Sequence, residues 1–370
     1  MPEDELTALL TLNRIDGLGC IGAKYLYEQL GSAQEIFRNR EHLKEFIPGI
    51  DQHIIDELTG SGYVSFIREE LEFIDKHGIR CITPADPEYP ARMLDCNDAP
   101  LVLFSLGNVN YNAARLVAIV GTRKATDYGR RMCRTFVKEL HELCPDVTIV
   151  SGLAYGIDIE SHRAALEEGC PTIAVLAHGL DMIYPSAHRS TAKEMLADGG
   201  LVTEFMSRTV PLGQNFVRRN RIIAGLSDAV VVVESAAKSG SLITAEIAGS
   251  YNRECFAFPG SVGDPYSVGC NELIRDNHAS LITSALDMVN ALNWNGRERR
   301  GKAVQKELFP ELTDDESRVY ERVRLKAQGV FISTLMTELN MPFPKLSSVL
   351  LSLEMKGLVK QAPGSLCKPC

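Results

Sequence analysis

The sequence predicts an α/β protein built on a doubly wound parallel sheet. From residue 116 to about residue 292, short apolar runs alternate with helix-length amphipathic stretches such as 128–143 and 242–252. The predicted strands are LVAIVG, VTIVSG, TIAVLA, LVTEF, AVVVVE and CFAFPG. Each run is almost continuously apolar, as expected for a strand buried on both faces of a sheet. Repetition of strand, helix and strand favours parallel strands with helices on both faces.

The length of 370 residues predicts two or three domains, because one hydrophobic core rarely grows that large. No apolar run is long enough to span a bilayer, and the opening MPEDELTALL lacks the basic-then-apolar order of a signal peptide. We therefore expect a cytoplasmic protein without a membrane partner. The net charge of −9 argues weakly against nucleic acid, although local basic loops matter more than the average.

Ten cysteines are scattered without a repeated spacing, which favours reduced, mostly buried thiols over a disulfide framework. Cys133, Cys255 and Cys270 fall inside predicted elements. The terminal CKPC places Cys367 and Cys370 at the spacing of metal ligands, but no second pair lies near them in the sequence. We predict no metal and no cofactor, with zinc at this pair as the alternative.

Residues 1–76 are predicted to form a helical domain of the helix-hairpin-helix or SAM-like type. Gly17, Gly19 and Gly22 form a tight turn between apolar helical faces, and such a turn can offer backbone N–H groups to a phosphate. A plain helical turn with glycine caps is the alternative. The proline-rich stretch 78–108 is predicted to extend the edge of the following domain, which we place at 77–292.

Residues 293–311 are polar and charged, and we predict a linker there. Residues 312–366 then show three helical patterns and a short final strand, the outline of a winged-helix domain. The second helix of its helix-turn-helix, 343–355, has few basic side chains. A protein-contact or structural role is therefore as well supported as DNA binding.

In a doubly wound sheet, ligands bind beyond the carboxyl ends of the strands. The loops that follow three of the predicted strands offer glycine turns, hydroxyl groups and cations, and one of them precedes a helix whose first N–H groups can hold a phosphate. These residues are Gly121, Thr122, Arg123, Lys124, Ser151, Gly152, Lys238, Ser239, Gly240 and Ser241. The pattern predicts a binding site for an anion.

A second basic stretch, GQNFVRRNRIIAGLSD, belongs to a segment without acidic residues between Glu204 and Asp228. The candidate contacts here are Phe216, Arg218, Arg219, Asn220 and Arg221, with Arg208 shortly before them. Several guanidinium groups near one aromatic ring favour a run of phosphates with a base stacked on the ring. Core packing of the ring and a solvated helix face are the alternatives. The sequence contains neither a dinucleotide-binding G-x-G-x-x-G nor a P-loop at this place.

Seven segments occur in order from about residue 78 to residue 292: VAIVGTRKAT, VSGLAYGIDIESHRAAL, TIAVLAHGLD, NFVRRNRIIAGLSDAVVVVE, SGSLITA, FAFPGSV and GCNELIRD. Together they resemble the DNA-processing protein A (DprA/Smf) family. The resemblance implies an extended Rossmann-like domain that binds single-stranded DNA, and we predict that the protein is not an enzyme. It also implies a homodimer that protects incoming DNA and helps to load RecA recombinase in natural transformation, competence and DNA recombination.

The family motifs fall on residues already singled out. The G-[ST]-R phosphate site corresponds to Gly121–Arg123, the basic loop to 216–221 and the serine-glycine turn to 239–241. Many members have arginine where Tyr155 stands, although a tyrosine can stack instead. The family's dimer surface lies in the region of Leu273, Ile274, Leu281 and Ile282; packing of these four side chains into the core is the alternative.

An enzyme is the second hypothesis. Related folds include phosphoribohydrolases of the lysine-decarboxylase-like family, whose motif P-G-G-x-G-T-x-x-E carries a working glutamate. The stretch SGSLITAE offers Thr244 and Glu246 in a comparable place but lacks the proline and the paired glycines. Asp158 and His162 could form an acid–base pair one helical turn apart, yet a helix cap and a surface or half-buried histidine fit the same pattern.

Overall fold

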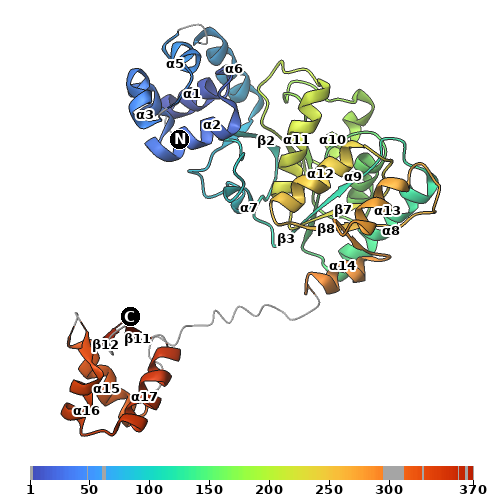
Figure 1. Cartoon of the computed structure of the whole chain (residues 1–370). Helices are drawn as coiled ribbons and strands as arrows, with labels where there is room; N and C mark the ends of the chain where they lie inside the picture. The colour runs from blue at the N-terminus through green and yellow to red at the C-terminus, as the bar shows by residue number, and fades with distance from the viewer. Residues whose placement is uncertain are drawn as a thin grey trace. The chain divides into compact units, whose positions relative to one another are not determined.

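The computed structural model describes residues 3–47, 49–60, 64–294, 312–326, 329–356, 358–362 and 366–369. The contacts between residues divide the chain into two units, Met1–Asn295 and Gly296–Cys370, each described here by itself (Figure 1). Most of the predicted linker, 295–311, lies outside the described residues. Trp294 does not: it packs against the core of the first unit, so the predicted linker starts two residues too early.

The first unit begins with short helices, shown in blue in Figure 1. They are α1 (Glu3–Leu12), α2 (Gly19–Leu30), α3 (Ala33–Arg38), η1 (Arg40–His42), α4 (Leu43–Phe46), α5 (Gln52–Thr59) and α6 (Val64–His77). Gly17 and Gly19 have φ values of 79° and 60°, so the predicted glycine turn needs the left-handed backbone that glycine adopts without strain. Phe104 of the neighbouring sheet and Leu101, just before its strand, complete this helical core.

A mixed sheet follows, in the order β1-β2-β6-β5-β4-β3-β7-β8-β9. Its strands are β1 (Arg80–Ile82), β2 (Leu103–Gly107), β3 (Arg115–Val120), β4 (Val147–Ser151), β5 (Thr172–Val175), β6 (Gly200–Thr203), β7 (Ala229–Val232), β8 (Glu254–Ala257) and β9 (Ser280–Leu281). Strands β3 to β9 are parallel, while β2 runs antiparallel to both β1 and β6. All six predicted strands are present, and the predicted edge extension supplies β1 and β2.

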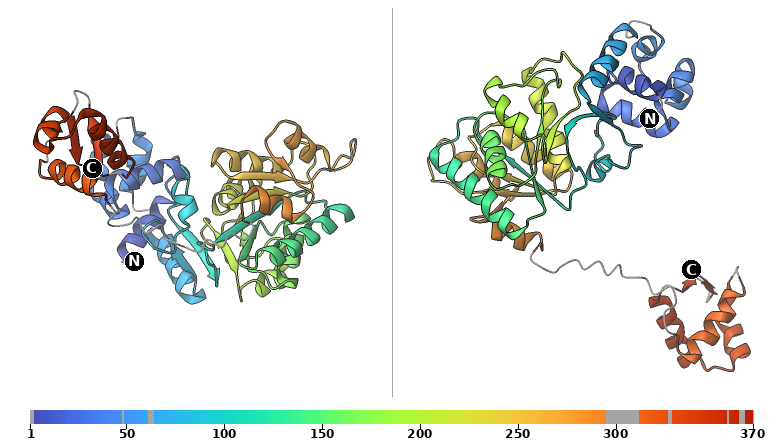
Figure 2. Two further views of the ribbon diagram at one scale, coloured as in Figure 1. Left: turned by 90° about the horizontal axis from the view of Figure 1, so that it is seen from below. Right: turned by 180° about the vertical axis from the view of Figure 1, so that it is seen from behind.

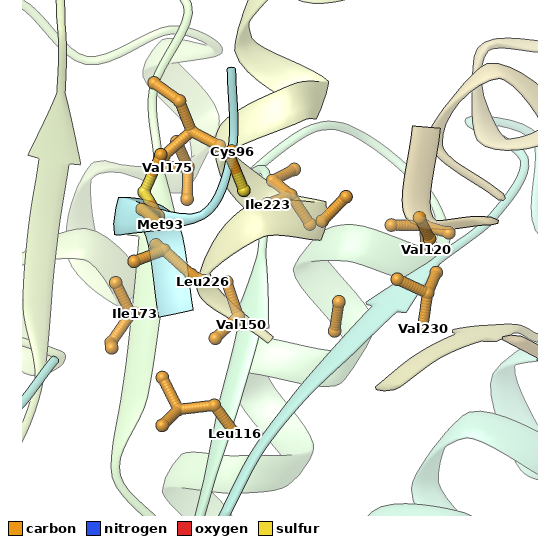
Figure 3. Close-up of a cluster of buried hydrophobic side chains, with 14 of the residues drawn as sticks. Met93, Cys96, Leu116, Val120, Val150, Ile173, Val175, Ile223, Leu226 and Val230 are labelled. Carbon is orange, nitrogen blue, oxygen red and sulfur yellow. The ribbon is translucent and has the colours of Figure 1, made fainter. Parts of the chain in front are cut away.

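Helices cover both faces of this sheet. They are α7 (Ala91–Leu94), α8 (Asp127–Leu143), α9 (Ile157–Glu167), α10 (Arg189–Glu194), α11 (Gly213–Leu226), α12 (Gly240–Ser250), α13 (Val268–Arg275) and α14 (Ala285–Ala291). Along β3, Leu116 and Val120 join a core with α11 and α12, whereas Val117 and Ile119 join a core with α8 and α14. Figure 2 shows the layers from two further sides, and Figure 3 shows part of the first core. The predicted doubly wound sheet is confirmed.

The direction of winding reverses at β3. From β3 the chain passes to β4, β5 and β6 on one side, and β7, β8 and β9 lie on the other. The crevice beyond the carboxyl ends of β3 and β7 is the place where such sheets bind ligands. Cys133, Cys255 and Cys270 are buried, free thiols, as predicted.

The second unit has three helices and a three-stranded antiparallel sheet in the order β10-β12-β11. Its elements are α15 (Asp314–Arg324), β10 (Val330–Phe331), α16 (Ile332–Leu339), α17 (Phe343–Met355), β11 (Val359–Ala362) and β12 (Leu366–Pro369). Lys345, the one lysine of α17, pairs with Asp315 at 2.6 Å. Cys367 is buried in this unit, and Cys370 lies outside the described residues.

Candidate nucleic-acid interface

A cavity of about 340 Å³ lies at the carboxyl ends of the central strands, where the winding reverses. The predicted site residues that line it are Gly121, Thr122, Arg123, Phe216, Arg219, Asn220, Ser239, Gly240 and Ser241. They come from the loop after β3, from α11 and from the start of α12. Segments that are far apart in the sequence therefore meet at one place, as the strand-end argument predicted.

The turn after β3 is held from behind by Glu234, a buried residue that sequence reasoning missed. The Thr122 N–H donates to the Glu234 carbonyl at 2.7 Å. The Glu234 carboxylate accepts from the Thr126 N–H at 2.8 Å and from its hydroxyl at 2.6 Å. A side chain at Gly121 would place its Cβ 2.5 Å from Ile157, so only glycine fits. The sequence signal for this supporting residue was the glutamate at the end of the apolar run AVVVVE.

Three exposed cations belong to the loops that border the cavity: Arg123, which lines it, and Lys124 and Lys238, each next to a lining residue in the sequence. Within the described residues, none of them forms an ion pair with an acidic side chain. The Arg123 guanidinium lies over the Phe216 ring, 4.8 Å from its centroid. This positive charge is therefore free to meet an anion from solvent.

The start of α12 presents hydroxyl groups to the same cavity. Ser239 lies 2.6 Å from Ser235 and 2.7 Å from Ser241, measured between hydroxyl oxygens. Ser239 is the N-cap residue of α12, and its side chain makes no capping hydrogen bond to the first N–H groups of the helix. Asn220 donates to the Gly240 carbonyl at 3.2 Å and fixes this turn against α11. Uncapped amides with hydroxyl groups beside them are typical of a phosphate site.

Arg219 lines the cavity but is only 3% exposed. It donates to the Gly152 carbonyl at 2.7 Å and to the Val175 carbonyl, and so ties the ends of β4 and β5 together. Burial lowers the pKa of Arg219 to about 10, which the nearby Asp158 carboxylate opposes, so the guanidinium stays charged at neutral pH. The predicted alternative of a solvated helix face is wrong for this residue.

Two predicted phosphate contacts, Arg218 and Arg221, instead hold a carboxylate. Both donate to Glu204 Oε2, Arg218 at 3.0 Å, and both contact the Cys20 thiol of the N-terminal turn. The Glu204 side chain is fully buried and Arg221 is nearly so. The segment itself contains no acidic residue, but Glu204 at its border lies beside both arginines in space and pairs with them. Arg208 is likewise paired, with Glu69 at 2.7 Å.

Of the other predicted contacts, Ser151 and Gly152 sit behind the cavity. The buried Ser151 hydroxyl donates to the Ile119 carbonyl at 2.6 Å, which is a structural role. Gly152 contributes the carbonyl that Arg219 binds. Both residues support the loop rather than line the cavity.

Asp158 and His162 are both buried, so the prediction of a surface or half-buried histidine is wrong, and the predicted helix cap by Asp158 is wrong because another residue takes that position. Gly156 is the N-cap of α9, and Asp158 lies in its first turn. Burial raises the pKa of the Asp158 carboxyl, whereas it lowers the pKa of His162 to about 3. The neutral ring of His162 accepts from the Leu153 N–H at 3.3 Å and holds the loop after β4.

The residues of the predicted dimer surface differ in their exposure to solvent. Leu273 and Ile282 are buried in the core of the single chain, so the expectation that Leu273 offers an interface is wrong. Leu281 is 51% exposed on the edge strand β9, and Ile274 is half-buried beside it. Only the last two can meet a second copy.

Comparison with known proteins explains this arrangement. The family model described as DNA recombination-mediator protein A matches residues 80–293, and the DprA winged helix domain matches residues 306–365. The chain belongs to the DNA-processing protein A family. The winged-helix prediction for the second unit is thereby confirmed.

Relatives within the family are similar over most of the chain. Protein Smf of Escherichia coli is 36% identical over 310 residues, 82% of each chain. DNA processing protein DprA of Streptococcus pneumoniae is 40% identical over 204 residues, 55% of this chain and 71% of the relative. The X-ray structure of that protein aligns with a TM-score of 0.57 at 33% identity, covering 73% of this chain and 96% of its own.

A second family structure concerns DNA processing protein A of Helicobacter pylori and its single-stranded DNA binding mode. It aligns with a TM-score of 0.53 at 29% identity, covering 58% of this chain and 96% of its own. In the part of the chain that the structure describes, no group of three or more His, Cys, Asp or Glu side chains could hold a metal ion. Nor does any helix there combine the length and apolar character needed to cross a membrane.

Proposed function

We propose that the chain binds single-stranded DNA in the cavity beyond β3 and β7, as a recombination mediator. One observation carries the proposal: the Gly121–Arg123 turn and the uncapped start of α12 face the same cavity. Family membership and the single-stranded DNA binding of the Helicobacter pylori relative support it.

The groups at the cavity suit a sugar-phosphate backbone. Arg123, Lys124 and Lys238 offer cations that form no ion pair among the described residues, and Ser239 and Ser241 offer hydroxyl groups. Phosphate contacts of this kind position a strand but do not read its sequence. We therefore expect little base preference.

A single strand suits the cavity better than a duplex. An aromatic ring such as Phe216 can only stack on a base that is not already stacked and paired. The Arg123 guanidinium now covers this ring, so a base that stacks there displaces the guanidinium towards a phosphate. Duplex DNA offers the phosphates but not the free base.

Binding of oligonucleotides tests the proposal. The full chain is titrated with a labelled single strand and with the duplex of the same length, and a nucleotide-hydrolysis assay runs alongside. We expect tighter binding of the single strand and no turnover. Equal or tighter binding of the duplex would reject the cavity as a single-strand site.

Loading of RecA recombinase is the further role that family membership supports. We propose that DNA held in this cavity is protected in the cytoplasm and handed to RecA during transformation and recombination. The assay is RecA-dependent strand exchange on DNA already coated with a single-strand-binding protein. The chain should restore exchange; failure to restore it would limit the chain to binding.

A homodimer is the second partner that we propose, through the edge of the sheet at β9. Leu281 is exposed there and Ile274 lies beside it, around a hollow of about 410 Å³. Leu281→Arg should give a folded monomer, measured by light scattering. If the unchanged chain is itself monomeric, the proposal fails.

Catalysis of the phosphoribohydrolase type has less support. Thr244 lines the cavity, but Glu246 is exposed two residues further along α12 and does not line it. We propose that the chain does not cleave nucleoside monophosphates. A turnover that Glu246→Gln abolishes would establish the enzyme instead.

A further inference from the structure

Two exposed tyrosine rings lie beside the cavity, outside the phosphate-binding groups. Tyr184 is 46% exposed, and its ring centroid is 6.1 Å from that of Phe216, with the planes 61° apart. Tyr155 is 49% exposed and meets the buried ring of His188 edge to face at 5.0 Å. Aromatic rings with one side in solvent are suited to stack on a flat ligand.

The two tyrosines belong to the same edge of the sheet as the cavity. Tyr155 lies in the loop after β4, next to Ala154, which lines the cavity. That loop packs directly on the phosphate-binding turn, because a Cβ on Gly156 would lie 2.1 Å from the Thr122 carbonyl oxygen. Tyr184 lies in the loop between β5 and η2 (Ser186–His188), and the strands β4 and β5 are neighbours.

Both loops are fixed while their rings remain exposed. Leu153 has a left-handed φ of 55°; His162 accepts from its N–H, and Nδ1 of His188 lies 2.7 Å from its carbonyl oxygen. The Tyr184 N–H donates to His178 Nε2 at 3.2 Å. A ring on a rigid backbone loses little conformational freedom when a ligand stacks on it.

Phe216 alone is poorly placed for a run of bases. It is half-buried, and the guanidinium groups of Arg123 and Arg219 lie 4.8 and 5.9 Å from its centroid. Among the described residues, no guanidinium lies over Tyr184 or Tyr155. The tyrosines therefore present the accessible aromatic faces around the cavity.

We infer that Tyr184 and Tyr155 are stacking positions for the bases on either side of the cavity, so that consecutive bases of one strand meet Phe216, Tyr184 and Tyr155. The inference rests on the proposed binding of single-stranded DNA and specifies how the bases are held. Stacking on an aromatic ring tolerates every base, so these positions add affinity without sequence preference.

Substitution separates stacking from charge. Tyr184→Ala should weaken binding of a thymidine oligonucleotide by about fivefold or more, whereas Tyr184→Phe keeps the ring and the affinity. Neither changes the slope of log affinity against log salt, because no charge is lost. Tyr155→Arg should steepen that slope by about 0.7 through one new phosphate contact. Tyr25→Ala is the matched control, since this tyrosine of α2 is 47% exposed away from the cavity.

Photocross-linking of the unchanged chain gives a second readout that does not depend on folding of a variant. An oligonucleotide with 5-iododeoxyuridine is irradiated in the complex, and the cross-linked peptides are identified by mass spectrometry. We expect cross-links at Tyr184 or Tyr155. Full affinity of Tyr184→Ala together with no cross-link at either tyrosine would overturn the inference, while a single strand that still binds better than duplex leaves the proposed function standing. Loss of that preference would instead reject the proposed function.

Discussion

The two sides of helix α11 differ in what their polar side chains do. On one side, Phe216, Arg219 and Asn220 line the cavity beside the exposed Arg123. On the other side, Arg218 and Arg221 share the buried carboxylate of Glu204 with the thiol of Cys20. Residues one or two positions apart on this helix therefore either line the cavity or hold a buried carboxylate. The difference teaches that an arginine-rich helix is not a measure of available charge, because the fold decides which guanidinium groups already have a carboxylate partner.

The largest expected effect is a loss of stability on substitution of Glu204, which pairs with two arginines of α11. Glu204→Gln leaves two guanidinium groups without their counter-charge, one of them buried. Loss of one partner of a buried ion pair lowers the free energy of unfolding by about 3–5 kcal/mol. Denaturant unfolding measures the change. The control is Glu69→Gln, whose exposed pair with Arg208 is worth about 0–1 kcal/mol; equal effects of the two substitutions would contradict the assignment.

Arg123→Ala should have the opposite effect: it should weaken DNA binding and leave the stability almost unchanged. Loss of a charge-assisted contact to phosphate weakens single-strand binding by roughly tenfold or more. The melting temperature should stay almost unchanged, because the side chain is exposed and lies over the half-buried Phe216 ring rather than in the core. Arg130→Ala, an exposed arginine of α8 outside the cavity, is the matched control. A large loss of stability in Arg123→Ala would make this residue structural.

The stability of the protein should fall in acid because of His162, which holds the loop after β4. His162 has a pKa of about 3 in the folded chain because it is buried, against an ordinary value of about 6.5. Between these values the unfolded chain binds a proton that the folded chain does not, so stability falls as pH falls below about 6.5. For one such group, the free energy of unfolding falls by up to about 1.4 kcal/mol per pH unit. His162→Asn should reduce this dependence, measured by unfolding at several pH values, whereas His42→Asn, at an exposed histidine, should keep it.

Salt dependence gives the smallest but most specific effect. Three unpaired cations at the mouth predict a slope of about −2 for log affinity against log salt. Arg123→Ala should reduce the magnitude of this slope by about 0.7, because each phosphate contact contributes about that amount. Arg218→Ala should leave the slope nearly unchanged, since its guanidinium is bound to Glu204. A slope near −3.5, about the value for five contacts, would mean that Arg218 and Arg221 reach the DNA after all.

The sequence predicted the sheet well because strands buried on both faces leave an unmistakable apolar pattern. The apolar runs around Val117 and Val231 could be identified as strands without knowledge of the strands that they pair with. Strand ends and glycine turns predicted which loops meet at this edge of the sheet, and Gly121 and Ser239 do line one cavity there. Pairing across distant segments could not be predicted: Glu204 precedes Arg221 by 17 residues, and only the fold brings them together.

The residues that were missed share this cause. Glu234 acts through backbone contacts to a turn more than a hundred positions earlier in the chain. The position of Tyr184 beside Phe216 depends on the loop after β5 meeting the start of α11. The burial of Leu273 likewise follows from its place on α13 against the sheet, which an apolar residue in a short segment does not reveal.

Hydrogen–deuterium exchange with and without a single-stranded oligonucleotide tests the central claim most directly. The cavity account predicts slower exchange in three segments, 121–125, 152–156 and 239–243, because DNA covers their amides or orders their loops. It predicts unchanged exchange in the turn at 14–20 and in α17, which lie outside the proposed site. Protection confined to those last two segments, with none at the three that border the cavity, would contradict it.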